Sequence, residues 1–251
     1  MVTIASLPSG SSTIMNFKYI LAPIALFAMS AMSQAADFTW NFAEAAGPVN
    51  AAHKAFTSTT VNGVDYVLTA YGFHAPSNAP ALPTNTTNWN FNNATSVNLY
   101  EKYDGANSGE TGLGLSGEGD HEIERNTFIQ LDLVNLQHHL KDLTIFVGSL
   151  QQGEGFDIWG SNTLGTPGQF LYSSHSVHGS NSELIESYMM ADINTYRYVS
   201  VSAWTSPNGQ YASGSDDVCI KNGLSAVPAP EPAPMLALGL GAVVMLRRRK
   251  K

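Results

Sequence analysis

The apolar residues of this chain recur with a period of two, in short runs separated by clusters of Gly, Asn, Pro and Ser. This alternation is typical of β-strands with one buried face, whereas an amphipathic helix needs a period near 3.6. The intervening clusters hold the residues that turns favour. We therefore expect an all-β fold, an antiparallel β-sandwich. The predicted strands are residues 64–73, 96–103, 128–133, 143–150, 156–161, 169–174, 196–204 and 216–223.

The N-terminal segment indicates export. Residues 15–35 hold one cation, Lys18, then an apolar stretch, and then Ser33 and Ala35 at the −3 and −1 positions of a cleavage site. These are the features of a secretory signal peptide. A core helix is the alternative interpretation of the apolar stretch. Because no charged side chain precedes Met15, we expect translation to begin there and not upstream.

With residues 1–35 and 227–251 set aside, residues 36–226 are long enough for one domain with a sizeable core. They carry six cations and 19 carboxylates, a net charge of −13. Such an acidic surface repels phosphate backbones, so we expect no nucleic-acid partner, whereas divalent cations suit it. The single cysteine, Cys219, cannot form an internal disulfide. We interpret it as a small apolar side chain in a strand, because no activating base is placed beside it in the sequence.

The C-terminal segment, VPAPEPAPMLALGLGAVVMLRRRKK, has three ordered parts. Its apolar run of 12 residues is short beside the roughly 20 that cross a bilayer, so it suits a temporary tag better than the alternative, a stop-transfer anchor. The prolines at its start hold an extended strip of backbone that a peptidase can reach. The three parts are Pro230, Glu231 and Pro232, then residues 235–246, then Arg247, Arg248 and Arg249 with two lysines.

This tail resembles the PEP-CTERM sorting signal of Gram-negative bacteria, which combines a Pro-Glu-Pro motif, a short apolar helix and a basic cluster. The resemblance implies cleavage by a membrane-embedded, exosortase-type enzyme after a transient stay in the inner membrane. It also implies delivery to the cell surface or to extracellular polysaccharide. The sequence VPAPEP stands where VPEP is commoner, which leaves the cleavage position open.

A second resemblance covers residues 127–223. The strings FIQLDL, LTIFVGS, GFDIWGSN, YRYVSVSAW and DDVCIKNG are similar, in order, to strands of galactose-binding-like and carbohydrate-binding jelly rolls. The resemblance implies a jelly-roll fold and binding of sugar. It also implies a structural calcium ion held by carboxylates near the two ends of the domain, where Asp216 and Asp217 are the matching pair.

An acidic segment, GLGLSGEGDHEIERN at 112–126, is the other candidate for calcium. Glu118, Asp120, Glu122 and Glu124 alternate, so in an extended chain they point to one side, and calcium would relieve their repulsion. The spacing differs from an EF-hand, and a solvated acidic loop is the alternative. We interpret the glycines of this segment as sites of tight backbone bends.

Enzymatic interpretations gain little support. No nucleophile elbow, HExxH, phosphate loop or dinucleotide motif occurs, and the histidine pairs 138–139 and 175/178 lack a marked third zinc ligand. For ligand contact by an aromatic side chain we favour Trp89, in TTNWNFNN, over Trp159 and Trp204, which lie in strand patterns. A loop folded over its own aromatic is the alternative for Trp89.

The function expected from the sequence is that of an exported, non-catalytic protein of the surface or extracellular matrix that binds exopolysaccharide. A purely structural biofilm component and a secreted polysaccharide hydrolase are the alternatives. Calcium is the one cofactor that the residues suggest.

Overall fold

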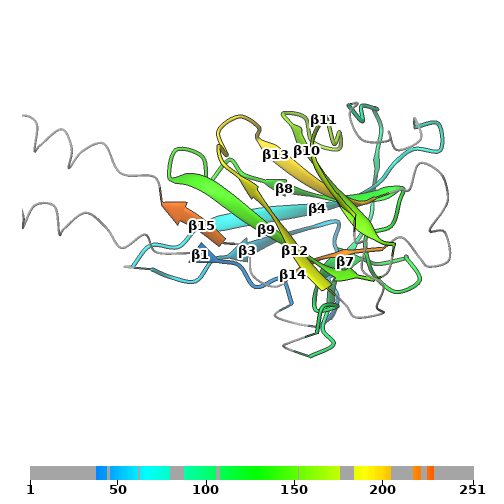
Figure 1. Ribbon diagram of the computed structural model, residues 1–251, viewed down its shortest axis with the longest axis horizontal. Helices are drawn as coiled ribbons and strands as arrows, with labels where there is room; N and C mark the ends of the chain where they lie inside the picture. The colour runs from blue at the N-terminus through cyan, green and yellow to red at the C-terminus, as the bar shows by residue number, and fades with distance from the viewer. Residues whose placement is uncertain are drawn as a thin grey trace, which may run out of the picture. The chain divides into compact units, whose positions relative to one another are not determined.

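Two antiparallel β-sheets pack against each other in the computed structural model of the chain (Figure 1). The structure describes residues 38–43, 46–61, 63–79, 88–105, 108–151, 153–175, 184–204, 217–221 and 225–228. The first sheet has the order β1 (Phe38–Thr39), β15 (Ser225–Pro228), β9 (Leu140–Leu150), β14 (Cys219–Lys221), β7 (Gly112–Leu115), β6 (Leu99–Lys102) and β2 (Gly47–Pro48), with β12 (Leu184–Met190) also paired to β9. The second has the order β11 (Gln169–His175), β10 (Gly155–Ser161), β13 (Tyr198–Ala203), β8 (Thr127–Asp132), β4 (Val67–His74) and β3 (His53–Thr57), with β5 (Thr95–Ser96) paired to β4.

The strand order is that of a jelly roll. Strands β7, β14, β9 and β12 are neighbours in the first sheet, and strands β8, β13, β10 and β11 are neighbours in the second. From β7 to β14 the chain changes sheet at every connection except the β10–β11 hairpin. Eight strands wound between two sheets in this way form the two Greek keys of a jelly roll. The predicted antiparallel β-sandwich is confirmed.

The main core lies between the two sheets and follows from the period of two. In β8, Ile129 and Leu131 point into it, and in β10, Phe156 and Ile158 do the same. Their counterparts from the first sheet include Leu113, Leu115, Leu143, Ile145, Val147 and Ile220. All are fully buried, and this apolar burial is the main source of stability in a domain without a disulfide.

A second apolar cluster covers the outer face of the second sheet. Phe128 and Trp159 alternate with core residues along β8 and β10, and they pack with Phe73, Ala75 and Trp89. Trp89 is 1% exposed, and its backbone pairs with Gly168. The interpretation of Trp89 as a surface contact for a ligand is therefore wrong, because its ring is buried against Phe91, Phe128 and Trp159. Trp159 and Trp204 are buried, as the strand patterns predict.

The glycine-rich stretch at 112–115 is a strand, which corrects its interpretation as bends. A Cβ on Gly112 would lie 2.3 Å from the carbonyl oxygen of Ile220, and one on Gly114 would lie 1.9 Å from that of His121. Glycine is required at both positions because backbone packs directly against them. Gly117, with a φ of 106°, lies in a turn and Gly119 lies in a bend, so the expectation holds at these two positions.

The sequence patterns did not indicate β3 or β12. In β12 the outward face carries Ile185 and Met189, which are 45% and 62% exposed, so apolar residues occupy both faces and hide the alternation. Strand β15 ends at Pro228, which pairs with Leu140 after a shift in register. The sandwich thus extends two residues into the segment that we assigned to the tail.

The predicted signal peptide, Asp216 and the sorting residues Pro230, Glu231, Pro232, Arg247, Arg248 and Arg249 lie outside the described residues. Among the described residues, we find no helix with the length and hydropathy that crossing a bilayer requires.

Candidate metal centre

Three carboxylates from distant parts of the sequence meet beside the first sheet. Asp120 and Glu122 follow β7, and Asp217 precedes β14. The two segments are joined by a backbone bridge in which the N–H of Ile123 donates to Val218 (2.7 Å) and the N–H of Val218 donates to Ile123 (3.1 Å). Ile123 and Val218 are buried in the core. Because side chains alternate along extended backbone, the acidic neighbours of these two residues lie on the opposite side.

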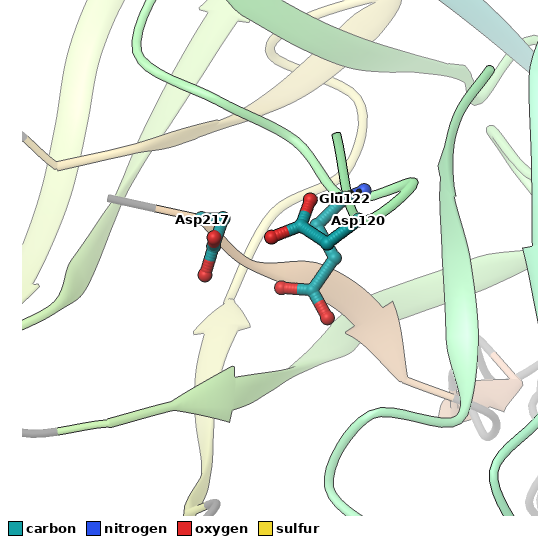
Figure 2. A group of neighbouring side chains, drawn as sticks. All are labelled: Asp120, Glu122 and Asp217. Atoms are coloured by element: carbon teal, nitrogen blue, oxygen red, sulfur yellow. Dashed lines mark hydrogen bonds between the residues drawn. The ribbon is translucent and has the colours of Figure 1, made fainter. Parts of the chain in front are cut away.

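The three carboxyl groups face a common space, as Figure 2 shows. Each offers an oxygen within 4.8 Å of the others, and within the described residues no other such group of His, Cys, Asp or Glu occurs. Asp120 lies within hydrogen-bonding reach of Asp217, which requires that one of the two groups is protonated or that a cation lies between them. Asp120 also accepts the N–H of Glu122 at 3.3 Å.

Glu122 is the most deeply placed of the three, with 1% of its surface exposed. Its Oε1 accepts hydrogen bonds from Lys102 Nζ (2.5 Å) and Ser149 Oγ (2.9 Å). Its Oε2 is buried and has no hydrogen-bond partner among the described residues. Burial raises the pKa of Glu122, and the contacts with Lys102 and Ser149 offset part of that rise. A buried oxygen without a donor is costly, and a cation in the common space would satisfy it.

Lys102 supplies part of the compensating charge. It also contacts Glu110 at 2.8 Å. Burial alone would lower the pKa of Lys102, but the hydrogen bonds to Glu110 and Glu122 outweigh burial and hold the pKa well above its ordinary value. Lys102 and the nearby Lys221 against Asp120, Glu122, Asp217 and Glu110 still leave an excess of negative charge, so the three carboxylates retain their attraction for a cation.

Glu154 borders the same charged region and is 4% exposed. Burial raises its pKa to about 7, the N–H of Gln151 acts in the opposite direction, and repulsion from Glu122, Asp120 and Glu110 adds to the rise.

Cys219 is fully buried, and burial raises the pKa of its thiol far above the physiological range. A thiol in that state is a poor nucleophile.

The structure describes five of the six predicted metal ligands and separates them into two groups. It brings Asp120, Glu122 and Asp217 together, whereas Glu118 and Glu124 interact with each other near His74. Burial and the repulsion from Glu124 raise the pKa of Glu118. The backbone bend at Gly117 and the turn that follows break the extended geometry needed to align all four acids of the segment. Lys102, Ser149 and Glu154 were not identified from the sequence, because nothing in their spacing links them to the acids.

The residues fit calcium. It takes six to eight oxygen ligands at 2.3–2.6 Å, so two oxygens on one ion lie at most about 5 Å apart, which the three carboxylates satisfy. All of the donors are hard oxygens, with no sulfur or imidazole in the group. Asp120, Glu122 and Asp217 would hold the ion, which would bind the loop after β7 to the start of β14.

Comparison with known proteins does not place the chain in a family. No family model matches it, and no curated protein matches it. It is similar to the K3 cleaved adhesin domain of Lys-gingipain from Porphyromonas gingivalis W83, with 11% identity and a TM-score of 0.35 over 77% of this chain and 97% of that one. The K1 domain of the same protein gives 10% identity and a TM-score of 0.29 over 77% and 95%. The fold assignment rests on the strand order, and likenesses this slight add nothing about function.

Proposed function

We propose that this chain is an exported, non-catalytic protein of the cell surface or extracellular matrix, whose jelly roll is stabilised by calcium bound to Asp120, Glu122 and Asp217. The observation that carries the proposal is the convergence of these three carboxylates around a buried, unpartnered Glu122 oxygen. Because the ligands come from both ends of the jelly roll, the ion joins segments that are about 95 residues apart in the chain.

The predicted signal peptide and sorting tail support an extracellular setting. Calcium sites in extracellular modules commonly have dissociation constants of about 10⁻⁴–10⁻³ M. A small number of protein ligands is sufficient for such weak affinity. A site with three carboxylates and an adjacent lysine suits that range, since Lys102 competes for Glu122. The domain would then reach full stability only after export.

A non-catalytic role is supported by the state of the reactive groups. The Cys219 thiol is sealed in the core, and Glu122 is held by Lys102 and Ser149. Glycoside hydrolysis needs two carboxylates across an accessible bond, whereas Glu122 and Asp217 are 1% and 2% exposed. Exopolysaccharide is the partner that the proposed location favours. A purely structural biofilm role and a secreted hydrolase remain as alternatives that binding and activity assays separate.

Export and sorting are tested by the intact mass of the protein recovered from outside the cell. We expect an N-terminus near Ala36 and loss of roughly the last 20 residues, as an exosortase-type enzyme would produce. Glu231→Ala should leave a longer precursor at the inner membrane, because the change removes the motif without altering the apolar run. Recovery of extracellular protein that retains residues 247–251 would contradict the sorting mechanism.

A further inference from the structure

A solvent-open groove lies on the outer face of the second sheet, where residues 163–166 fold over the side chain of Gln130. Its walls are residues 92–94 on one side and the β10–β11 turn, residues 163–166, on the other, and Phe73 contributes to its floor. The groove has a volume of about 560 Å³, which is within the range of small-ligand sites in proteins.

Both walls are fixed by hydrogen bonds within the described structure. Gln130, which is fully buried, accepts the N–H of Gly165 (2.8 Å) and donates to the carbonyl oxygen of Thr166 (3.1 Å). The hydroxyl of Thr166 donates to the carbonyl oxygen of Phe91 at 3.1 Å, which ties one wall to the other. A groove that is already rigid loses little conformational entropy when a ligand binds.

The chemistry of the lining is uncharged. No ionisable side chain lines the groove, although the domain carries 19 carboxylates. Asn92, Asn93 and Thr163 are exposed there, and within the described residues no hydrogen bond occupies the two side-chain amides. An amide both donates and accepts, as a sugar hydroxyl does. Leu164, 45% exposed, adds apolar surface for the C–H face of a pyranose ring.

We propose that this groove binds an uncharged sugar unit of a neutral polysaccharide, with Asn92 and Asn93 contacting hydroxyl groups and Leu164 packing against the ring. An acidic sugar would find no cation in the groove and would meet the negative field of the domain. This inference deepens the proposed function and rests on it for the source of the polysaccharide. Binding by the purified protein does not depend on export or on calcium.

The test is a glycan array that carries neutral hexose, pentose and deoxyhexose oligosaccharides beside uronate and phosphate-substituted ones, probed with the purified full-length chain. Calorimetry then measures affinity for the best neutral oligosaccharide. We expect the double change Asn92→Ala and Asn93→Gly to weaken binding about tenfold or more, since two polar contacts are lost. Asn93 has a φ of 67°, a left-handed conformation that glycine adopts without strain. Glycine is therefore used at position 93 so that the backbone conformation is preserved. Leu164→Ala should also weaken binding severalfold.

Matched controls are Asn98→Ala and Val134→Ala, which alter an exposed amide and an exposed apolar side chain outside the groove. Both should bind like the wild type, and unchanged melting temperatures show that all variants fold. Binding of acidic glycans alone, no neutral glycan bound, or equal affinity in the groove variants would overturn the inference. None of these outcomes bears on export, which the intact mass tests separately.

Discussion

At the scale of single residues, two buried acids link the stability of the fold to pH. Asp157 is 2% exposed on β10, where its Oδ1 has no hydrogen-bond partner among the described residues. Burial raises its pKa from 3.8 to about 7, although a hydrogen bond from Ser173 acts in the opposite direction. The pKa of Glu154 is also raised to about 7. The folded state therefore binds more protons than the unfolded state between about pH 4 and 7, and stability falls as pH rises through that window.

Asp157→Asn should remove its share of this pH dependence. Asparagine has the same shape and cannot ionise. The free energy of unfolding of the variant should therefore equal that of the wild type near pH 4 and exceed it increasingly as pH rises toward 8. We expect a gain of a few kcal/mol in the free energy of unfolding, because each pKa unit corresponds to about 1.4 kcal/mol. Urea denaturation across this pH range measures it.

The control for Asp157→Asn is Asp104→Asn, which makes the same chemical change at an exposed position. Asp104→Asn should leave unaltered the difference in the free energy of unfolding between pH 4 and pH 8. If Asp157→Asn and wild type keep parallel pH profiles, the ionisation of Asp157 does not influence stability.

At the scale of elements, β7 is the strand that positions the three carboxylates of Asp120, Glu122 and Asp217 relative to one another. It pairs with β14 through Gly112 and Lys221 and through Leu113 and Ile220. The acidic loop leaves its end, and Asp217 precedes its partner strand. The distance between the carboxylates is therefore set by how closely β7 and β14 approach.

Gly112→Ala should disrupt this pairing. The added methyl group would lie 2.3 Å from the carbonyl oxygen of Ile220, so the strands must separate, at a cost of about 3 kcal/mol in unfolding free energy. Gly119→Ala is the matched control, since nothing lies within 4 Å of its Cβ position. Equal melting temperatures for the two variants would show that the close approach of β7 and β14 carries no energetic weight.

Much of the fold was predictable from the sequence, because in most strands core-facing apolar residues alternate with outward-facing ones. Strands such as β8 and β10 lie within a residue or two of their predicted bounds. Strand β7 was missed because a glycine can be required either by a turn or by close contact with neighbouring backbone, and the sequence does not distinguish these two causes. The metal candidate was predictable only in part. The pairing of Asp217 with Asp120 and Glu122 depends on the bridge between Ile123 and Val218, which no local pattern shows.

At the scale of the whole molecule, the excess of carboxylates is the feature that the proposed calcium ion would offset. Residues 36–226 carry a net charge of −13, and self-repulsion of that size opposes the compact state. A divalent cation bound to Asp120, Glu122 and Asp217 would offset part of this repulsion, where segments from the two ends of the jelly roll meet. Because ligand carboxylates must be ionised, the effect of calcium should weaken as pH falls through the raised pKa of Glu122.

The most direct measurement is the melting temperature of the purified protein at pH 7.5 in EDTA and in increasing calcium. At a calcium concentration 100 times the dissociation constant we expect about 2.7 kcal/mol of added stability, a rise of about 5–10 °C. Asp217→Asn should abolish most of the rise, while Asp65→Asn, at an exposed position, should retain it. A melting temperature that does not change with calcium, or a rise that Asp217→Asn leaves intact, would contradict calcium binding at Asp120, Glu122 and Asp217.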